Sequence, residues 1–279
     1  MTVKMRSIAV VAFMMGAALT ACGAEPMAAR QADPATSDSR SGAGGAFSAV
    51  VADAKDDVNQ ELTKLLKEEK TLEEVAQGFN DLLKLPEGDY VLATEECGQA
   101  NAFWSPDDKK ITICYELLTD AVAKAEENFS TEQEKDDYVT GVLLDTLFHE
   151  LGHALISIYD LPTVGKEDDA VDQLSAIYMI EIGEAGQNYA LQAAQSYFIA
   201  AGDSDRDSLP FYDEHSMDEQ RAYNYACLVY GSDPEKFADL VGETDDSYLP
   251  QARAERCPEE WAKVSAAWNK LLEPHLRSS

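Results

Sequence analysis

Two histidines and a glutamate stand at a spacing that suits metal-dependent hydrolysis. The stretch DTLFHELGHAL holds His149, Glu150 and His153. On a helix, residues i and i+4 lie one turn apart on one face, so both imidazoles can reach one ion. Glu150 projects about 100° around the axis, where it can take a proton from a bound water. Because zinc lowers the pKa of such a water towards about 7, this spacing predicts two ligands and a general base.

The residues around this motif predict a deeply buried helix. Gly152 is a poor helix former, but it would let another segment approach closely. The alternative to a metal site is a core helix whose two histidines are satisfied by hydrogen bonds. The apolar residues of the segment are Leu143, Leu144, Leu147, Leu151, Ala154 and Leu155.

A catalytic zinc also needs a third protein ligand and an open position. The segment GKEDDAVDQLSA begins the next predicted helix and offers Glu167, Asp168, Asp169 and Asp172. Asp168 and Asp172 share a helix face, so one could bind the metal while the other orients a histidine N–H. Such a run is also typical of an acidic helix N-terminus that the helix dipole stabilises.

The N-terminus has the features of an exported lipoprotein. Lys4 and Arg6 precede an apolar run at 8–19 that is too short to span a bilayer, which predicts a signal peptide over residues 1–21. The ending Leu-Thr-Ala-Cys resembles a bacterial lipobox, which implies cleavage before Cys22 and lipidation of its sulfur. An ordinary secretory signal is the alternative. We expect the mature protein in the periplasm or on the cell surface, anchored to the membrane through Cys22.

The remaining chain divides into a tether and a folded part. Residues 22–46 are rich in Ala, Ser, Gly, Asp and Pro, and they cannot bury enough apolar surface to offset their ordering entropy. We expect a flexible tether there. Residues 47–279 carry aliphatic and aromatic side chains throughout, and we expect them to form one domain.

The composition is strongly acidic, with 22 Lys and Arg against 52 Asp and Glu and a formal net charge of −30. Nucleic-acid binding needs a basic surface, so this composition argues against a nucleic-acid partner. Electrostatic attachment to anionic lipid is disfavoured for the same reason. The simplest interpretation is a well-solvated surface.

Four cysteines remain besides Cys22, and an even number in an exported chain suggests two disulfides. Three pairings are possible, and we expect the two that are local in sequence. A cysteine-based zinc site is disfavoured because no C-x-x-C pair is present. The expected disulfides are Cys97–Cys114 and Cys227–Cys257.

Apolar spacing and turn residues predict an α+β fold, with a small sheet followed by helices. Residues 49–80 predict one or two amphipathic helices, and the turn SPDDKK predicts a β-hairpin over 99–115. A Cys97–Cys114 bridge would tie the open end of this hairpin. The further predicted helices cover 136–159, 166–183, 187–200, 217–230, 234–240 and 258–272.

The motifs together resemble those of known peptidases. H-E-L-G-H followed by D-D-A-V-D-x-x-S is similar to the gluzincin pattern H-E-x-x-H then E-x-x-A-D-x-x-A of thermolysin-like and minigluzincin peptidases. The chain resembles more closely a bacterial family of zinc metallopeptidases catalogued as a domain of unknown function. This resemblance extends from about Glu96 to Gly231 and implies a zincin-like fold. Its stretches are CGQANAFWSPDDKKITICYELL, FHELGHALISIYDLPTVGKEDDAVDQLSA and DEHSMDEQRAYNYACLVYG.

The resemblance implies roles for individual residues. It makes His149 and His153 metal ligands and Glu150 the general base. Its register assigns the third ligand to Asp168, and Asp172 then orients a histidine. The family pattern has Glu where this chain has Asp168, one methylene shorter, so Glu167 could reach the metal instead, and Asp169 or Asp172 remain further candidates.

Peptide hydrolysis also requires a donor for the developing oxyanion. Thermolysin-like enzymes place a His or Tyr at this point, and the resemblance favours His215 in DEHSMDEQRAYNY. Helix capping near Ser216 is the alternative role of this histidine. Its rivals as donor are Arg221, Tyr223 and Tyr225. In zincins the strand nearest the active helix pairs with the substrate, which by resemblance would be Lys110–Tyr115.

We therefore expect a lipid-anchored endopeptidase that binds one zinc ion per chain and acts on a peptide or protein substrate. The same site could instead act as an amidase on cell-wall peptides. A different alternative is a binding or assembly lipoprotein whose zincin fold keeps a metal for structure. The presence of Glu150 argues against that alternative, because a structural site does not need a base.

Overall fold

A computed structural model describes residues 44–203, 209, 211–242 and 248–277. The expected signal peptide at 1–21, the lipidation site Cys22 and nearly all of the expected tether at 22–46 lie outside the described residues. Among the residues that are described, no helix combines the length and the apolar character needed to cross a membrane.

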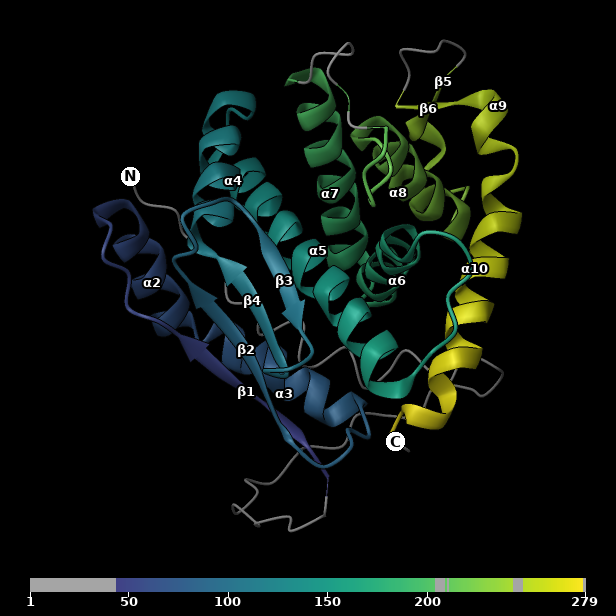
Figure 1. Cartoon of the computed structure of the whole chain (residues 1–279). Coiled ribbons are helices and arrows are strands. Elements are labelled where there is room, and N and C mark those ends of the chain that lie inside the picture. Colours follow the sequence, from purple (N-terminus) through teal and green to yellow (C-terminus); the bar gives the residue numbers. More distant parts are fainter. Residues whose placement is uncertain (1–43, 204–208, 210, 243–247, 278–279) are drawn as a thin grey trace, which may run out of the picture.

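The fold is mixed α and β, and a four-stranded sheet forms its N-terminal part (Figure 1). The strands are β1 (Ala46–Val51), β2 (Asp89–Glu95), β3 (Ala102–Ser105) and β4 (Lys110–Cys114). They lie in the order β1-β2-β4-β3. The β1 and β4 strands both run parallel to β2, whereas β3 and β4 form the antiparallel hairpin that the sequence predicted.

The N-terminal prediction was wrong for the residues that form β1. A helix was expected from Ala49, but the segment AFSAVV is a strand that pairs with β2. Its side chains alternate between the two faces of the sheet, with Phe47 buried and Val50 exposed. This strand pattern is short and is followed at once by a helical pattern, which is why its residues resemble the start of a helix. Those helices are α2 (Asp57–Glu69) and α3 (Thr71–Leu82).

The predicted substrate-pairing strand was also wrong. Lys110–Cys114 is an inner strand, because β2 pairs with one edge of β4 and β3 pairs with the other. Tyr115 already belongs to the next helix. An inner strand has no free backbone groups for a peptide to pair with. On this side of the described sheet, the edge strand is β3.

The chain after the sheet is mainly helical, as predicted (Figure 1). One prediction fails there, because the helix expected at 234–240 is only a 3-10 turn at Ala238–Leu240. A short parallel pair, β5 (Val241–Gly242) and β6 (Leu249–Pro250), and the single turn α9 (Gln251–Ala254) were not expected. The longer helices are α4 (Tyr115–Asn128), α5 (Glu132–Tyr159), α6 (Glu167–Glu181), α7 (Glu184–Asp203), α8 (Asp218–Ser232) and α10 (Cys257–Leu272).

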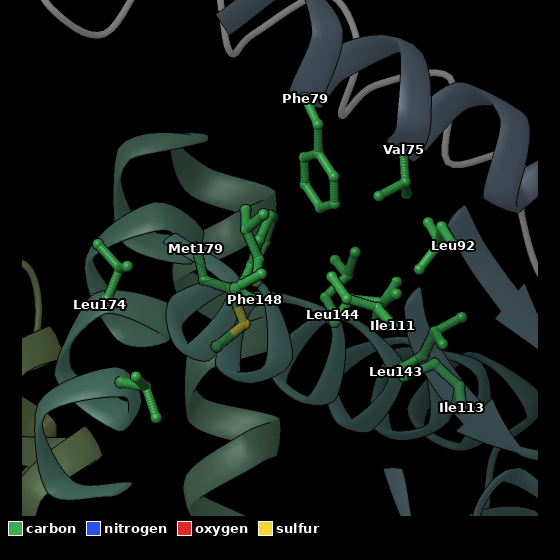
Figure 2. Close-up of a cluster of buried hydrophobic side chains, with 14 of the residues drawn as sticks. Val75, Phe79, Leu92, Ile111, Ile113, Leu143, Leu144, Phe148, Leu174 and Met179 are labelled. Carbon is green, nitrogen blue, oxygen red and sulfur yellow. The ribbon is translucent and has the colours of Figure 1, made fainter. Parts of the chain in front are cut away.

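Helix α5 is the centre of the fold. Thr131 caps its first turn by accepting a hydrogen bond from the Glu134 backbone N–H, and α4, α6 and α7 all pack along it. One face of the sheet meets the same helix, so Ile111 and Ile113 of β4 lie in one core with Leu143 and Phe148 of α5 (Figure 2). The long helix that carries the motif is therefore held on several sides by buried apolar contacts.

Both expected disulfides are present in the structure. Cys97 bonds to Cys114 at the end of β4, and Cys227 of α8 bonds to Cys257 at the start of α10. The first bridge closes the open end of the hairpin, where the Cys114 backbone N–H also donates to the Asn101 carbonyl oxygen at 3.0 Å. It therefore fixes the loop that leads into the edge strand β3.

Gly152 permits a close approach of α5 and α6, as the sequence suggested. A Cβ atom built on Gly152 would lie 2.7 Å from both Cβ and Cγ1 of Val171 on α6. Carbon atoms pack at about 3.5–4.0 Å, so no side chain fits there. The absence of a side chain at this position sets the distance between the two helices.

Replacement of Gly152 by alanine should therefore destabilise the fold. We expect Gly152→Ala to lower the free energy of unfolding by about 1–3 kcal/mol through overpacking, although alanine is the better helix former. Gly202→Ala in α7 is the matched control, because a Cβ there meets no atom within 4 Å. Urea denaturation measures both changes, and equal effects of the two substitutions would contradict the account of Gly152.

Candidate metal centre

The structure brings the two motif histidines together on α5. His149 and His153 lie one turn apart, and their Nε2 atoms are 3.2 Å from each other. The side chain of His149 is almost fully buried, and that of His153 is 20 % exposed. The motif therefore points both imidazoles from one face of a buried helix towards a common point.

Each imidazole is held from behind by a carboxylate of α6. Asp172 Oδ1 lies 2.7 Å from His149 Nδ1, and Glu167 Oε1 lies 2.8 Å from His153 Nδ1. An ionised carboxylate only accepts hydrogen bonds, so each Nδ1 carries the proton. In the neutral imidazoles both Nε2 atoms then present lone pairs to the same point.

Asp168 supplies the third group at this point. Its Oδ1 atom is 3.8 Å from His149 Nε2 and 3.5 Å from His153 Nε2. Glu167 and Asp172 instead occupy the outer nitrogens of the two rings. Asp169 faces a separate, smaller cavity. Of the four acidic candidates, only Asp168 shares the point where the two histidines meet.

This arrangement fits a divalent metal ion. With neutral imidazoles, two nitrogen lone pairs and a carboxylate oxygen converge with no donor among the three, and a cation between them would relieve this repulsion. Two imidazoles and one carboxylate are a donor set that suits zinc and leaves a position open for water. The Oδ1 atom of Asp168 also lies within 4.8 Å of ring nitrogens of both His149 and His215.

Arg221 of α8 balances the charge behind His149. Its Nε and Nη2 atoms each lie 2.7 Å from an oxygen of Asp172. Burial alone would raise the pKa of Asp172, but Arg221 and His149 hold it well below its ordinary value. Asp172 thus stays ionised and remains an acceptor for the His149 Nδ1–H.

Glu150 lines the same cleft as His149, His153 and Asp168. It is 7 % exposed, and burial raises the pKa of its carboxyl although His149 and His153 oppose that shift. A backbone hydrogen bond from Trp104 of β3 holds the side chain. A carboxylate with a raised pKa is a stronger base, as proton abstraction from water requires.

His215 approaches the same point from the segment before α8. Its Nε2 lies 3.1 Å from Asp168 Oδ1, and its ring stacks on His149 at 5.8 Å. Lys166 Nζ holds this segment by donating to the carbonyl oxygens of Asp213 and His215, at 3.1 and 3.0 Å. With its side chain 46 % exposed, His215 can contact both the convergence point and a molecule bound in the cleft.

The rival donors are placed differently. Arg221 is engaged with Asp172, and Tyr225 is buried with its hydroxyl on Asp145. Tyr223 lines the smaller cavity rather than this one. Of the four candidates for the oxyanion donor, His215 alone combines exposure with contact at the convergence point.

A cleft of about 1030 Å³ opens over these residues. Its walls come from β3, α5, the start of α6, α7 and the segment before α8. The edge strand contributes Ala102, Phe103 and Trp104, and Asn101 just before it also lines the cleft. A chain bound in this cleft would therefore lie between the convergence point and the edge of β3 that no described strand pairs with.

Sequence reasoning missed part of this centre. Asp145 and Tyr197 line the cleft and were not singled out, and Arg221 was considered only as an oxyanion donor. Asp145 lies one helical turn before His149, so its position on the same face of α5 was the only available indication. Tyr197 lies 52 residues away from Asp145 and carries no local pattern.

The geometry predicts which acidic residue is the third ligand. Asp168→Asn should weaken zinc binding by more than the roughly 10- to 100-fold that is typical when a ligand loses a hydrogen-bond partner. Glu167→Gln should weaken zinc binding only by about 10- to 100-fold, because Glu167 contacts a ligand and not the metal. Asp169→Asn is the matched control and should bind zinc like the wild type. Competition with a chromogenic chelator measures each affinity, and a wild-type value for Asp168→Asn would rule it out as a ligand.

Comparison with known proteins agrees with this donor set. Residues 52–272 match the family described as "Putative metallopeptidase" (DUF4344). No curated protein and no solved structure matches the chain. The matched range contains the convergence point, the cleft and both disulfides. The chain belongs to this metallopeptidase family.

Proposed function

We propose that the protein is a zinc-dependent peptidase that hydrolyses peptide bonds in exported peptides or proteins. The observation that carries this proposal is the meeting of His149 Nε2, His153 Nε2 and Asp168 Oδ1 in a cleft that Glu150 also lines. A structural zinc site closes all four positions with protein ligands and has no use for an adjacent base. This donor set leaves a position for water and supplies the base.

The proposed reaction uses the chain's own residues in three ways. His149, His153 and Asp168 would hold the metal, which when bound acidifies a water and polarises the substrate carbonyl. Glu150 takes the proton of the attacking water and passes it to the leaving amine. The Nε2–H group of His215 donates a hydrogen bond to the oxyanion that forms on the carbonyl carbon.

The edge strand suggests how a substrate is oriented. An extended peptide can add to β3 as a further strand, because that edge of the sheet is unpaired in the described structure. The backbone of β3 already reaches the base through the Trp104 hydrogen bond to Glu150. A peptide held on this edge would therefore present its bonds beside Glu150 and the metal position.

A zincin-like fold is part of the same proposal. It is supported by three features together: the motif on a central helix, an acidic residue on the next helix and a small sheet whose edge lines the cleft. Location in the cell envelope, through a lipid on Cys22, is also a proposal. It is supported by the N-terminal sequence pattern and is compatible with two disulfides, which persist in oxidising compartments.

The role of Glu150 separates a catalytic site from a structural one. Glu150→Gln should keep zinc at the wild-type content and lower the rate of peptide hydrolysis by about 100- to 10,000-fold, since a positioned base contributes that much. Glu184→Gln, at an exposed glutamate of α7, is the control. Elemental analysis and cleavage of a peptide library measure the two properties. Undiminished cleavage by Glu150→Gln would disprove the assigned mechanism.

The role of His215 makes a separate prediction. If this imidazole only stabilises the oxyanion, His215→Ala should retain zinc and lose about 100- to 1,000-fold in kcat, with a smaller change in KM. His275→Ala, at a histidine outside the cleft, is the control. Steady-state kinetics beside zinc analysis checks both values. Loss of zinc from His215→Ala would instead identify a ligand.

A further inference from the structure

Asp145 is a buried carboxylate to which the proposed function gives no role. It precedes His149 by one turn of α5 and is only 4 % exposed. Its oxygens accept hydrogen bonds from the hydroxyls of Ser175 at 2.7 Å, Tyr197 at 2.7 Å and Tyr225. The three donors come from α6, α7 and α8, so Asp145 joins α5 to each of the other helices around the centre.

Tyr197 connects Asp145 to the residues that surround the proposed metal position. The Arg221 guanidinium lies over the Tyr197 ring, 4.1 Å from its centroid. The same guanidinium makes the two 2.7 Å contacts with Asp172 that were described above. Asp172 in turn holds the Nδ1–H of His149 at 2.7 Å. Every step in this series is a directional contact between side chains that are largely buried.

The carboxylate of Asp145 restricts the orientation of the side chains that connect it to His149. An amide or an apolar group at this position would not do so. Ser175 and Tyr225 donate to one oxygen of Asp145 and Tyr197 donates to the other, whereas an amide offers only one acceptor oxygen. This fixes the rotation of the Tyr197 ring, and that ring supports the plane of the Arg221 guanidinium. Burial of a carboxylate is costly: burial and the nearby Asp172 raise the pKa of Asp145, although the three hydroxyls oppose that shift. A group with that cost points to a role beyond packing.

We propose that Asp145 and Tyr197 are positioning residues of the metal centre. They hold Arg221 in the orientation that pairs with Asp172, and Asp172 fixes the ring of His149 so that its Nε2 faces the metal position. This inference rests on the proposed role of His149 as a metal ligand. It adds two residues, both outside the H-E-x-x-H motif and the acidic segment, that tune metal binding without touching the metal.

A double-mutant cycle on zinc affinity tests the inference, with the full chain purified in detergent. Asp172→Asn should raise the dissociation constant of zinc by about 10- to 100-fold, as expected for the partner of a ligand. Asp145→Asn and Tyr197→Phe should each raise it by about fivefold or more, a smaller effect because each acts through further residues. When Asp172→Asn is already present, adding Asp145→Asn should change the constant by less than about twofold.

A matched tyrosine distinguishes positioning from general stability. Tyr248→Phe removes a hydroxyl that donates to the Leu191 carbonyl oxygen at 2.9 Å, so it loses a hydrogen bond as Tyr197→Phe does. The zinc affinity of Tyr248→Phe should equal that of the wild type, even where both substitutions lower the melting temperature equally. A thermal melt of the metal-free proteins provides that comparison.

The possible results distinguish failure of the positioning role from failure of the proposed peptidase function. Wild-type zinc affinity in Asp145→Asn and Tyr197→Phe, or effects that simply add to that of Asp172→Asn, would overturn the positioning role. If zinc binds and the cycle behaves as expected but no peptide is cleaved, the proposed peptidase function fails while the positioning role holds. If the wild-type chain binds no zinc, both proposals fail together.

Discussion

The close antiparallel contact of α5 with α6 is the constraint on which the rest of this structure depends. It consists of three levels one turn apart: Gly152 against Val171, His149 against Asp172, and Asp145 against Ser175. The missing side chain at Gly152 brings the helices close enough for Asp168 to reach the point between the histidines. If α5 and α6 lay further apart, the same residues would be present in the sequence but would not meet at one point.

Buried charge is balanced around that contact rather than avoided. Asp172 and Asp145 are both buried carboxylates. Arg221 pairs with Asp172, and its guanidinium also lies over the ring of Tyr197, whose hydroxyl donates to Asp145. Such groups are tolerated inside a protein when every one is paired and hydrogen-bonded. The cost of this arrangement is consistent with the proposed metal centre, in which the imidazole rings must keep one orientation because ligand geometry tolerates little error.

Local patterns predicted the parts of the fold that depend on local spacing. The His149 and His153 pair, the helix that carries them and the β3–β4 hairpin follow from residues a few positions apart, and the disulfide prediction also assumed local pairing. The parallel pairing of β1 with β2 depends on contacts across two helices, which no short pattern contains. For the same reason the role of Tyr197 and the pairing of Arg221 with Asp172 escaped prediction: the partners of both residues lie about 50 residues away. The choice among the four acidic residues of α6 needed the position of the helix axis.

The most direct test of the central claim is diffraction at the zinc absorption edge from crystals of the protein grown with zinc. The account predicts one strong anomalous peak, about 2.0–2.2 Å from His149 Nε2, His153 Nε2 and a carboxylate oxygen of Asp168. The Glu150 carboxylate should lie near this peak without binding it. The absence of a peak at this point, or a peak bound by other residues, would contradict the account.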